Sequence, residues 1–157
     1  YIDGKLFYEM YTGLKTVDIF FEDSQHTMKY VFGENNYEER YFDDVFVHAE
    51  DSYQDENLDT PEDKFNHFLS SLYLISITNV DAQAPAETGE LLIKVVYTKT
   101  DGTKVVVEAY KRDDTTAYLY KDGKYFGGYM KTAVRLYGDY EDFGIKGSLE
   151  VLTDAMK

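Results

Sequence analysis

The chain has 157 residues, a length typical of one domain that can bury a hydrophobic core of its own. Thirty acidic residues against sixteen basic ones give a net charge of -14, which disfavours nucleic acid and anionic lipid surfaces as partners because both are negatively charged. The absence of Cys excludes disulfides, thiolate chemistry and zinc–thiolate sites.

The N-terminal third predicts a short helix followed by strands. Apolar residues of segment 1–16 recur at spacings of three and four, which is typical of a helix. Segments 17–21 and 28–32 are rich in β-branched and aromatic residues and flank a six-residue polar turn, so they predict a hairpin. Segment 41–48 predicts a third strand, and segment 49–59 predicts a polar, acidic loop.

The clearest local signal is a helix start at Thr60. Thr60 can cap the helix, Pro61 suits the first helical position, and Asp63 lies three residues after the cap. We expect a helix over 61–73, followed by a strand within 74–80. The helix carries an apolar stripe, expected to pack against apolar residues of the sheet. The stripe is Phe65, Phe68, Leu69 and Leu72, and the sheet residues are Ile93, Val95, Val105 and Val107.

The second half predicts two further hairpins. Runs 91–98 and 104–110 flank one Asp-Gly pair, and runs 117–120 and 125–129 flank another. An Asp-Gly pair between two such runs is a strong hairpin signal, because both residues tolerate a positive φ. The sixteen Tyr and ten Phe of the chain also favour strands, where aromatic rings pack across a pleated face.

A second helix is predicted over 132–143, ending at Gly144, and segment 148–157 predicts at most a last turn. Strands outnumber helices and are joined by tight turns. We therefore expect residues 1–157 to form a single α+β domain, in which an antiparallel β-sheet is built from hairpins and two helices pack on it. The two halves share a hairpin-then-helix plan, although their residues do not align into a repeat.

The stretch 91–147 also resembles the C-terminal end of an uncharacterised bacterial protein family. The shared pattern is a strand, an Asp-Gly turn, a strand ending in Tyr110, a polar link, a short strand, a Gly-Lys turn, an aromatic strand and a helix. The preceding stretch 61–80 resembles the helix that comes before this pattern in the family. Members of the family are extracytoplasmic and often membrane-anchored, and many are encoded beside ABC-type exporters of the gliding-motility auxiliary kind.

The resemblance implies an extracytoplasmic, cell-surface location, a non-enzymatic role and no catalytic residues. It also implies that the chain is a fragment of a larger anchored protein, whose only contact with the membrane would be an anchor outside the sequence given. No run of apolar residues in the sequence is long enough for a membrane span, and the first residue is Tyr1 rather than Met.

The acidic loop before Thr60 carries an incomplete calcium pattern. Four acidic residues fall at the first, fifth, ninth and twelfth positions of a twelve-residue window, roughly where a calcium loop places oxygen ligands. They are Asp51, Asp55, Asp59 and Glu62. Tyr53 at the third position and Glu56 at the sixth, where calcium loops have Gly, break the pattern. We expect a solvated loop, with no required metal and no cofactor.

Other polar residues lack the spacing that catalysis needs. His26, His48 and His67 are dispersed, so we interpret them as ordinary surface histidines. The paired carboxylates lie next to one another in sequence and cannot be placed across a substrate from that alone. They are Asp43-Asp44, Asp113-Asp114 and Glu141-Asp142. No serine has a nucleophile-elbow context, and we expect no enzyme activity.

The tyrosines are the candidate ligand-binding residues. Tyr118 and Tyr120 share one face of a predicted strand, and Tyr125 shares a face with Gly127. Exposed aromatic rings can stack on sugar rings or contact a partner protein, whereas the alternative is that half of them fill the core. The Gly127-Gly128 pair indicates a bulge or a close backbone approach.

Two functions remain open at this point. The first is a non-catalytic interaction or scaffold domain of a bacterial cell-surface protein that binds another surface protein, including an accessory role to an ABC-type exporter. The alternative is a carbohydrate- or cell-wall-binding module that uses tyrosines and acidic side chains, although the absence of Trp counts against it.

Overall fold

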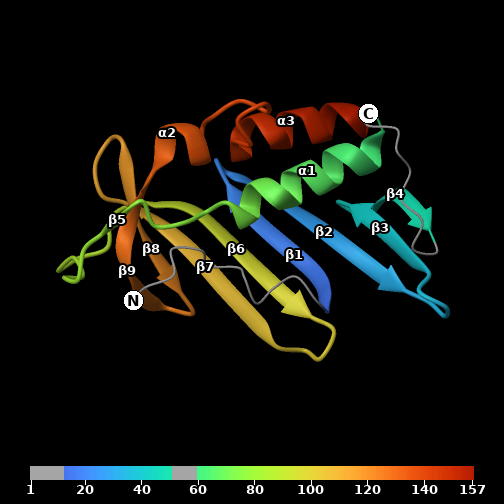
Figure 1. Ribbon diagram of the computed structural model, residues 1–157, viewed down its shortest axis with the longest axis horizontal. Helices are drawn as coiled ribbons and strands as arrows, with labels where there is room; N and C mark the ends of the chain where they lie inside the picture. Colours follow the sequence, from blue (N-terminus) through green and yellow to red (C-terminus); the bar gives the residue numbers. More distant parts are fainter. Residues whose placement is uncertain (1–12, 51–59) are drawn as a thin grey trace.

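The computed structural model describes residues 13–50 and 60–157, and these residues form one antiparallel sheet of nine strands with three helices. The expected α+β fold is therefore confirmed (Figure 1). Across the sheet the strands lie in the order β4-β3-β2-β1-β6-β7-β8-β9-β5. The strands are β1 (Leu14–Phe21), β2 (Ser24–Phe32), β3 (Glu38–Phe42), β4 (Val45–Glu50), β5 (Asn79–Val80), β6 (Leu91–Lys99), β7 (Lys104–Lys111), β8 (Thr116–Lys121) and β9 (Lys124–Lys131). The helices are α1 (Pro61–Tyr73), α2 (Thr132–Arg135) and α3 (Ile145–Ala155).

The sheet consists of two four-stranded meanders that meet at one seam. Strands β1 to β4 form the first meander and strands β6 to β9 the second, each with hairpin connections between sequential strands. The seam is the antiparallel pairing of β1 with β6, in which Ile19 lies opposite Val95. A helix follows each meander in the sequence, so the hairpin-then-helix plan of the two halves recurs in the topology.

Three hairpins turn on two residues that both have positive φ. These pairs are Glu22-Asp23, Asp43-Asp44 and Asp122-Gly123. Two successive residues of this kind give the mirror-image turn that matches the twist of paired strands. Two predictions are corrected as a result. The turn predicted over 22–27 is only two residues long, and the strand predicted over 41–48 is two strands, β3 and β4.

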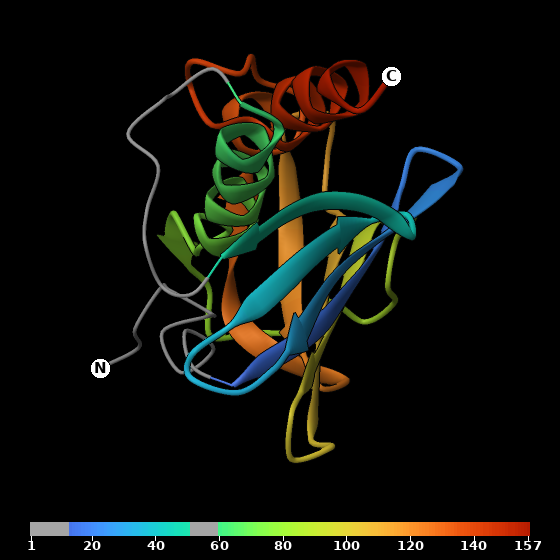
Figure 2. The ribbon, with the colours of Figure 1, turned by 90° about the vertical axis from the view of Figure 1, so that its right-hand side faces the viewer.

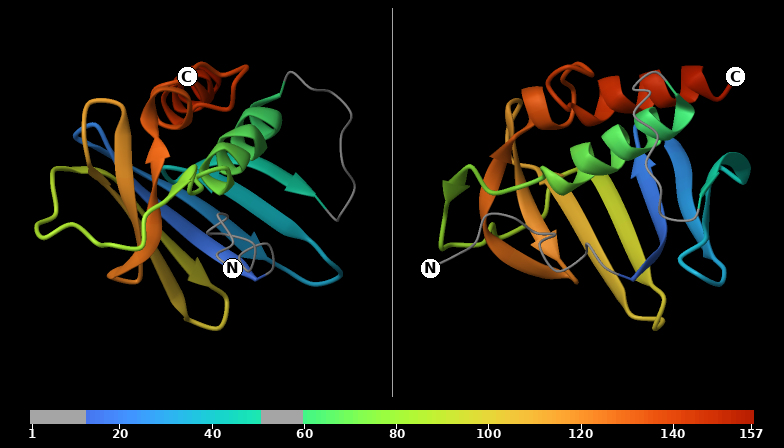
Figure 3. Two further views of the ribbon diagram at one scale, coloured as in Figure 1. Left: turned by 60° about the vertical axis from the view of Figure 1, so that its left-hand side comes forward. Right: turned by 45° about the vertical axis from the view of Figure 1, so that its right-hand side comes forward.

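Both long helices lie on one side of the sheet (Figures 2 and 3). Helix α1 begins as predicted, with the backbone N–H of Asp63 donating to the Thr60 hydroxyl at 3.2 Å. Its side chains Phe65, Phe68 and Leu72 are fully buried, while Leu69 is partly buried against the core. The Phe65 ring meets Tyr30 of β2 edge to face at 5.7 Å, which shows that α1 packs directly on the first meander.

The core lies between these helices and alternate residues of the strands. Ile93, Val95 and Val107 are buried as predicted, whereas Val105 is only partly buried. The ring of Tyr97 is also buried and stacks on Tyr73 at the end of α1 at 6.1 Å. In each strand, the side chains that alternate with the buried ones point to the opposite face of the sheet, which we call the open face. Within the described ranges no helix lies on the open face (Figure 2).

The second predicted helix is wrong in position. Instead of one helix over 132–143, α2 ends at Arg135, and α3 starts at Ile145 and runs through most of segment 148–157, where at most a last turn was expected. The reason is a close approach of two glycines. A Cβ atom on Gly144 would lie 2.2 Å from the backbone of Gly138, so the chain must turn back on itself there rather than continue as a helix.

Two smaller predictions also fail. Leu14, expected in a helix, begins β1, while residues 1–12 of that predicted helix lie outside the described residues. The strand predicted within 74–80 is reduced to the two residues of β5. In the part of the chain that the structure describes, no helix has both the length and the apolar character required to cross a membrane.

Candidate functional site

The open face of β7, β8 and β9 carries five tyrosines, which we call the tyrosine cluster. They are Tyr110, Tyr118, Tyr120, Tyr125 and Tyr129. The strand register explains the gathering: Tyr118 lies opposite both Tyr110 and Tyr129, and Tyr120 lies opposite Tyr125. All five are half-buried, whereas Ala117 and Leu119, which alternate with the tyrosines of β8, are buried in the core.

An irregularity in β9 sets this register. The β8–β9 pairing shifts between Tyr118 and Tyr120, and Gly127, opposite this shift, has a φ of +88°. Gly128 next to it approaches β5 so closely that a Cβ atom would lie 2.4 Å from the carbonyl oxygen of Asn79. The prediction of a bulge or close approach at Gly127-Gly128 is confirmed on both counts.

The rings of the cluster contact one another edge to face. The centre of the Tyr118 ring lies 5.8 Å from that of Tyr125 and 6.3 Å from that of Tyr129, with interplanar angles of 70° and 86°. Tyr120 lies 5.3 Å from Tyr110 and 5.7 Å from Tyr125, at 81° and 60°. Interlocked rings of this kind are rigid, but they do not form the flat row of exposed ring faces on which sugars stack.

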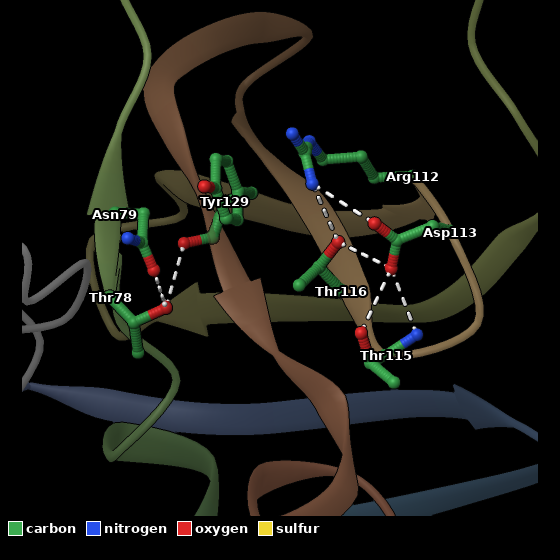
Figure 4. A network of polar contacts seen from close by, with 7 residues as sticks. All are labelled: Thr78, Asn79, Arg112, Asp113, Thr115, Thr116 and Tyr129. Atoms are coloured by element: carbon green, nitrogen blue, oxygen red, sulfur yellow. Dashed lines mark hydrogen bonds and ion pairs between the residues drawn. The ribbon is translucent and has the colours of Figure 1, made fainter.

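Arg112 lies beside Tyr129, one of the cluster tyrosines, and contacts the turn before β8 (Figure 4). Its guanidinium carbon lies 3.9 Å from the centre of the Tyr129 ring and 5.7 Å from that of Tyr118. Its Nη1 atom donates to Oδ2 of Asp113 at 3.0 Å and to the hydroxyl of Thr116 at 3.3 Å. A hydrogen bond with Tyr118 raises the pKa of Arg112, which is charged at every physiological pH. The guanidinium is thus fixed by stacking and by hydrogen bonds.

Asp113 is held as a carboxylate by the turn between β7 and β8. Its Oδ1 atom accepts hydrogen bonds from the Thr115 backbone N–H at 2.9 Å and from the Thr116 hydroxyl at 2.8 Å. These bonds lower the pKa of Asp113 to about 2. The backbone of Tyr129 is also held in place. Thr78 donates its backbone N–H and its hydroxyl to the Tyr129 carbonyl (Figure 4).

Two tyrosine hydroxyls of the cluster have partners on the same surface. The Tyr110 hydroxyl donates to the Glu108 carboxylate at 2.8 Å, and this bond raises the pKa of Tyr110. The Tyr125 hydroxyl donates to the Asp81 carbonyl oxygen at 2.6 Å, and burial raises its pKa. Both hydroxyls therefore remain neutral donors near neutral pH.

The charge of the chain is distributed unevenly around this site. Segment 91–131, which forms β6 to β9, contains eight basic and five acidic residues, whereas the remainder contains eight basic and twenty-five acidic. Three of the five acids accept backbone hydrogen bonds within turns and are occupied there: Asp101, Asp113 and Asp122. The four strands that include the tyrosine cluster are thus far less acidic than the rest of the chain.

Of the predicted site residues, the structure brings Tyr118, Tyr120 and Tyr125 together. The sequence interpretation missed Tyr110, Tyr129 and Arg112. Tyr110 ends the strand before the link 111–116, so pairing the two predicted strands across that link would have placed it beside Tyr118.

Of the four candidate calcium ligands, the structure describes only Glu62. Asp51, Asp55 and Asp59 lie outside the described residues. The Glu62 carboxylate faces the sheet, where Arg40 donates to it at 2.8 Å and His48 lies 3.3 Å away. Within residues 13–50 and 60–157 no three His, Asp or Glu side chains are grouped so that they could hold a metal ion.

The histidines, interpreted from the sequence as ordinary surface residues, each contact another part of the fold. His26 lies 2.7 Å from the Asp43 carboxylate, and His48 contacts Glu62. The ring of His67 lies between two aromatic rings, 3.8 Å from Tyr140 and 3.9 Å from Phe143. All three are half-buried, because each lies at a contact between two elements.

Two of the paired carboxylates stabilise turns. Asp43 accepts a hydrogen bond from the Thr27 backbone N–H at 2.8 Å, and Asp113 closes the turn before β8 as described above. Their neighbours in sequence, Asp44 and Asp114, are exposed. The oxygens of Asp43 and Asp113 are therefore engaged in the fold rather than directed at a shared cavity.

The chain matches no protein-family model, and no curated protein or solved structure is significantly similar to it.

Proposed function

We propose that this chain is a non-catalytic protein-recognition domain and that the tyrosine cluster with Arg112 is its binding surface. The observation that carries the proposal is the rigid group of five tyrosines and one arginine on a sheet face that no described helix covers. Tyr and Arg are the residue types most enriched in the energetic centres of protein interfaces, because they combine a large contact area with hydrogen bonding.

The ring geometry favours a protein partner over a glycan. A sugar ring stacks on the exposed face of an aromatic ring, but in this cluster ring edges point at ring faces, and Arg112 covers a face of Tyr129 at 3.9 Å. A protein segment, in contrast, can fill the notches between tilted rings with its own side chains. We also propose a cell-surface location and a link to an exporter, and both rest on the resemblance of residues 91–147.

The proposal is tested by locating where peptides bind. Peptides selected from a random library against the isotope-labelled protein are titrated into it, and the perturbed NMR resonances are mapped. We expect the largest shifts at the tyrosine cluster, and loss of binding in the double variant Tyr118→Ser with Tyr125→Ser. Val134→Ser is the matched control, since Val134 is 47% exposed on α2, away from the open face.

A thermal melt of each variant separates loss of binding from loss of folding. Mapping on the unaltered protein gives the same answer without any substitution. Selected peptides that gather elsewhere on the protein, or a glycan array that yields ligands where peptide selection yields none, would contradict a protein-recognition role at this face.

A further inference from the structure

We propose that Arg112 is the anchor for a carboxylate of the partner, so that the tyrosine cluster recognises an acidic segment of a protein with apolar residues beside the acid. This inference rests on the proposed function and adds the chemistry of the partner. It depends on the geometry of Arg112, on the charge around it and on the tyrosines beside it.

Arg112 is oriented before any partner arrives. The guanidinium carbon lies 3.9 Å from the centre of the Tyr129 ring, and the bonds from Nη1 to Asp113 and Thr116 hold the group in that position. Its contacts among the described residues do not use all the N–H donors of the guanidinium fork. Nearly a third of the side chain, 31%, is exposed. A planar fork held in this way matches a carboxylate, which it can bind through two parallel hydrogen bonds.

Charged residues of both signs surround Arg112, and each acidic one among those described here has another partner. Asp113 is the acidic group in contact with Arg112, and it lies beside the guanidinium at Nη1, with its other oxygen engaged in the turn. Lys131, which is exposed, lies opposite Thr116, the residue whose hydroxyl accepts from Arg112. Lys94 is further away, opposite Glu108 and 6.0 Å from the Phe20 ring of β1. An incoming carboxylate can therefore meet Lys131 in addition to Arg112.

The charge of the whole chain limits which acidic ligand fits. A net charge of -14 repels a long polyanion over its whole length. At physiological salt, interactions between exposed charges are screened beyond about 8 Å, so a short segment with one or two carboxylates experiences mainly the local surface. Apolar side chains next to those carboxylates would pack between the tilted rings of Tyr118, Tyr120 and Tyr125.

Fluorescence anisotropy with three labelled peptides tests the inference. The probes are short peptides in which Leu alternates with Glu, with Gln or with Lys. We expect the Glu–Leu peptide to bind the intact domain about tenfold more tightly than the Gln–Leu peptide, the effect of one charge-assisted contact. The Lys–Leu peptide should bind most weakly. Arg112→Gln should remove the preference for Glu, and Arg112→Lys should restore only part of it because an ammonium lacks the fork.

Lys104→Gln is the matched control, since Lys104 is an exposed positive residue of β7 that makes no contact with the cluster tyrosines in the described structure. It should keep the preference for Glu. Equal affinity for the Glu–Leu and Gln–Leu peptides, or the same loss with Lys104→Gln as with Arg112→Gln, would overturn the inference. Binding of a uronic acid oligosaccharide in preference to the Glu–Leu peptide would also overturn it, in favour of a glycan.

The two proposals fail in different ways. If library-selected peptides map to the tyrosine cluster but the Glu–Leu peptide does not bind there, the acidic partner is wrong and the recognition surface stands. If neither kind of peptide maps to the cluster, the recognition surface itself is wrong.

Discussion

The Nη1 atom of Arg40 in β3 lies 2.8 Å from Oε1 of Glu62 in the first turn of α1, and the side chains of both residues are at least seven-eighths buried, with exposed fractions of 12% and 9%. The same Nη1 donates to Asn66 at 2.9 Å, and Nη2 donates to Glu38 at 2.5 Å. Helix α1 is therefore attached to the first meander by a charged contact in addition to its apolar stripe.

Removing Glu62 should destabilise the domain strongly. Glu62→Ala takes a carboxylate partner from the buried Arg40 guanidinium, and breaking a buried ion pair from one side costs about 3 kcal/mol or more. The free energy of unfolding from urea titration measures this loss. Glu150→Ala, at an exposed position of α3, is the control and should change it little. A loss below about 1 kcal/mol for Glu62→Ala would show that the ion pair contributes little.

Truncating Phe68 should be equally costly for a different reason. Its side chain is fully buried between α1 and the sheet, so Phe68→Ala leaves a cavity and should lower the free energy of unfolding by about 3–5 kcal/mol. Leu69→Ala, one position further along α1 and only partly buried, should cost clearly less. Equal costs at the two positions would mean that the apolar stripe of α1 is oriented differently.

Asp113 should titrate well below the ordinary pKa of an aspartate. The Thr115 backbone N–H and the Thr116 hydroxyl stabilise its charged form, so its pKa falls from 3.8 to about 2. Because the pKa is lowered on folding, this stabilisation is fully present above pH 3.8 and is lost as the pH falls towards 2. Carboxyl ¹³C NMR reports the midpoint directly. Thr116→Val should raise it, and a midpoint near 3.8 in the unaltered protein would contradict the hydrogen bonding of the turn.

Calcium should not stabilise the domain. Glu62, one of the four acidic residues in the calcium pattern, is paired with Arg40 and His48 and is not available as a ligand. A specific site would stabilise the native state by about 2.7 kcal/mol at a hundredfold excess of ligand over Kd. We expect the same melting temperature in chelator and in millimolar Ca²⁺ at matched ionic strength. A rise of several degrees that Asp55→Ala with Asp59→Ala abolishes would establish a calcium site in the acidic loop.

Local signals allowed the sequence to predict some elements well. The start of α1 depends on Thr60, Pro61 and Asp63, which act within one turn, and two of the three hairpins of the second meander have Asp-Gly turns. The turn at Asp43-Asp44 has no Gly, so β3 and β4 merged into one predicted strand. The break between α2 and α3 depends on the contact of Gly138 with Gly144, which is a tertiary contact that helical spacing does not reveal.

In the candidate site, too, local signals predicted some residues and tertiary contacts brought in the others. Alternation along one strand was enough to place Tyr118 and Tyr120 on one face. Tyr129 shares the face of Tyr125 by alternation but lies opposite Tyr118 because the pairing shifts around Gly127, and Arg112 joins them from a stretch expected to be a polar link. Both depend on how β9 and the 112–115 turn fold back, which no local pattern specifies.

The seam between β1 and β6 has a consequence for how the chain could be divided. Each meander on its own would end in a strand of eight or nine residues with one row of backbone N–H and C=O groups unpaired. Within the intact chain, the pairing of β1 with β6 provides hydrogen-bond partners for both rows of backbone groups. A polypeptide cut in the 81–90 connection would retain this complementarity, and its two fragments are expected to reassociate along the same edge as a split protein.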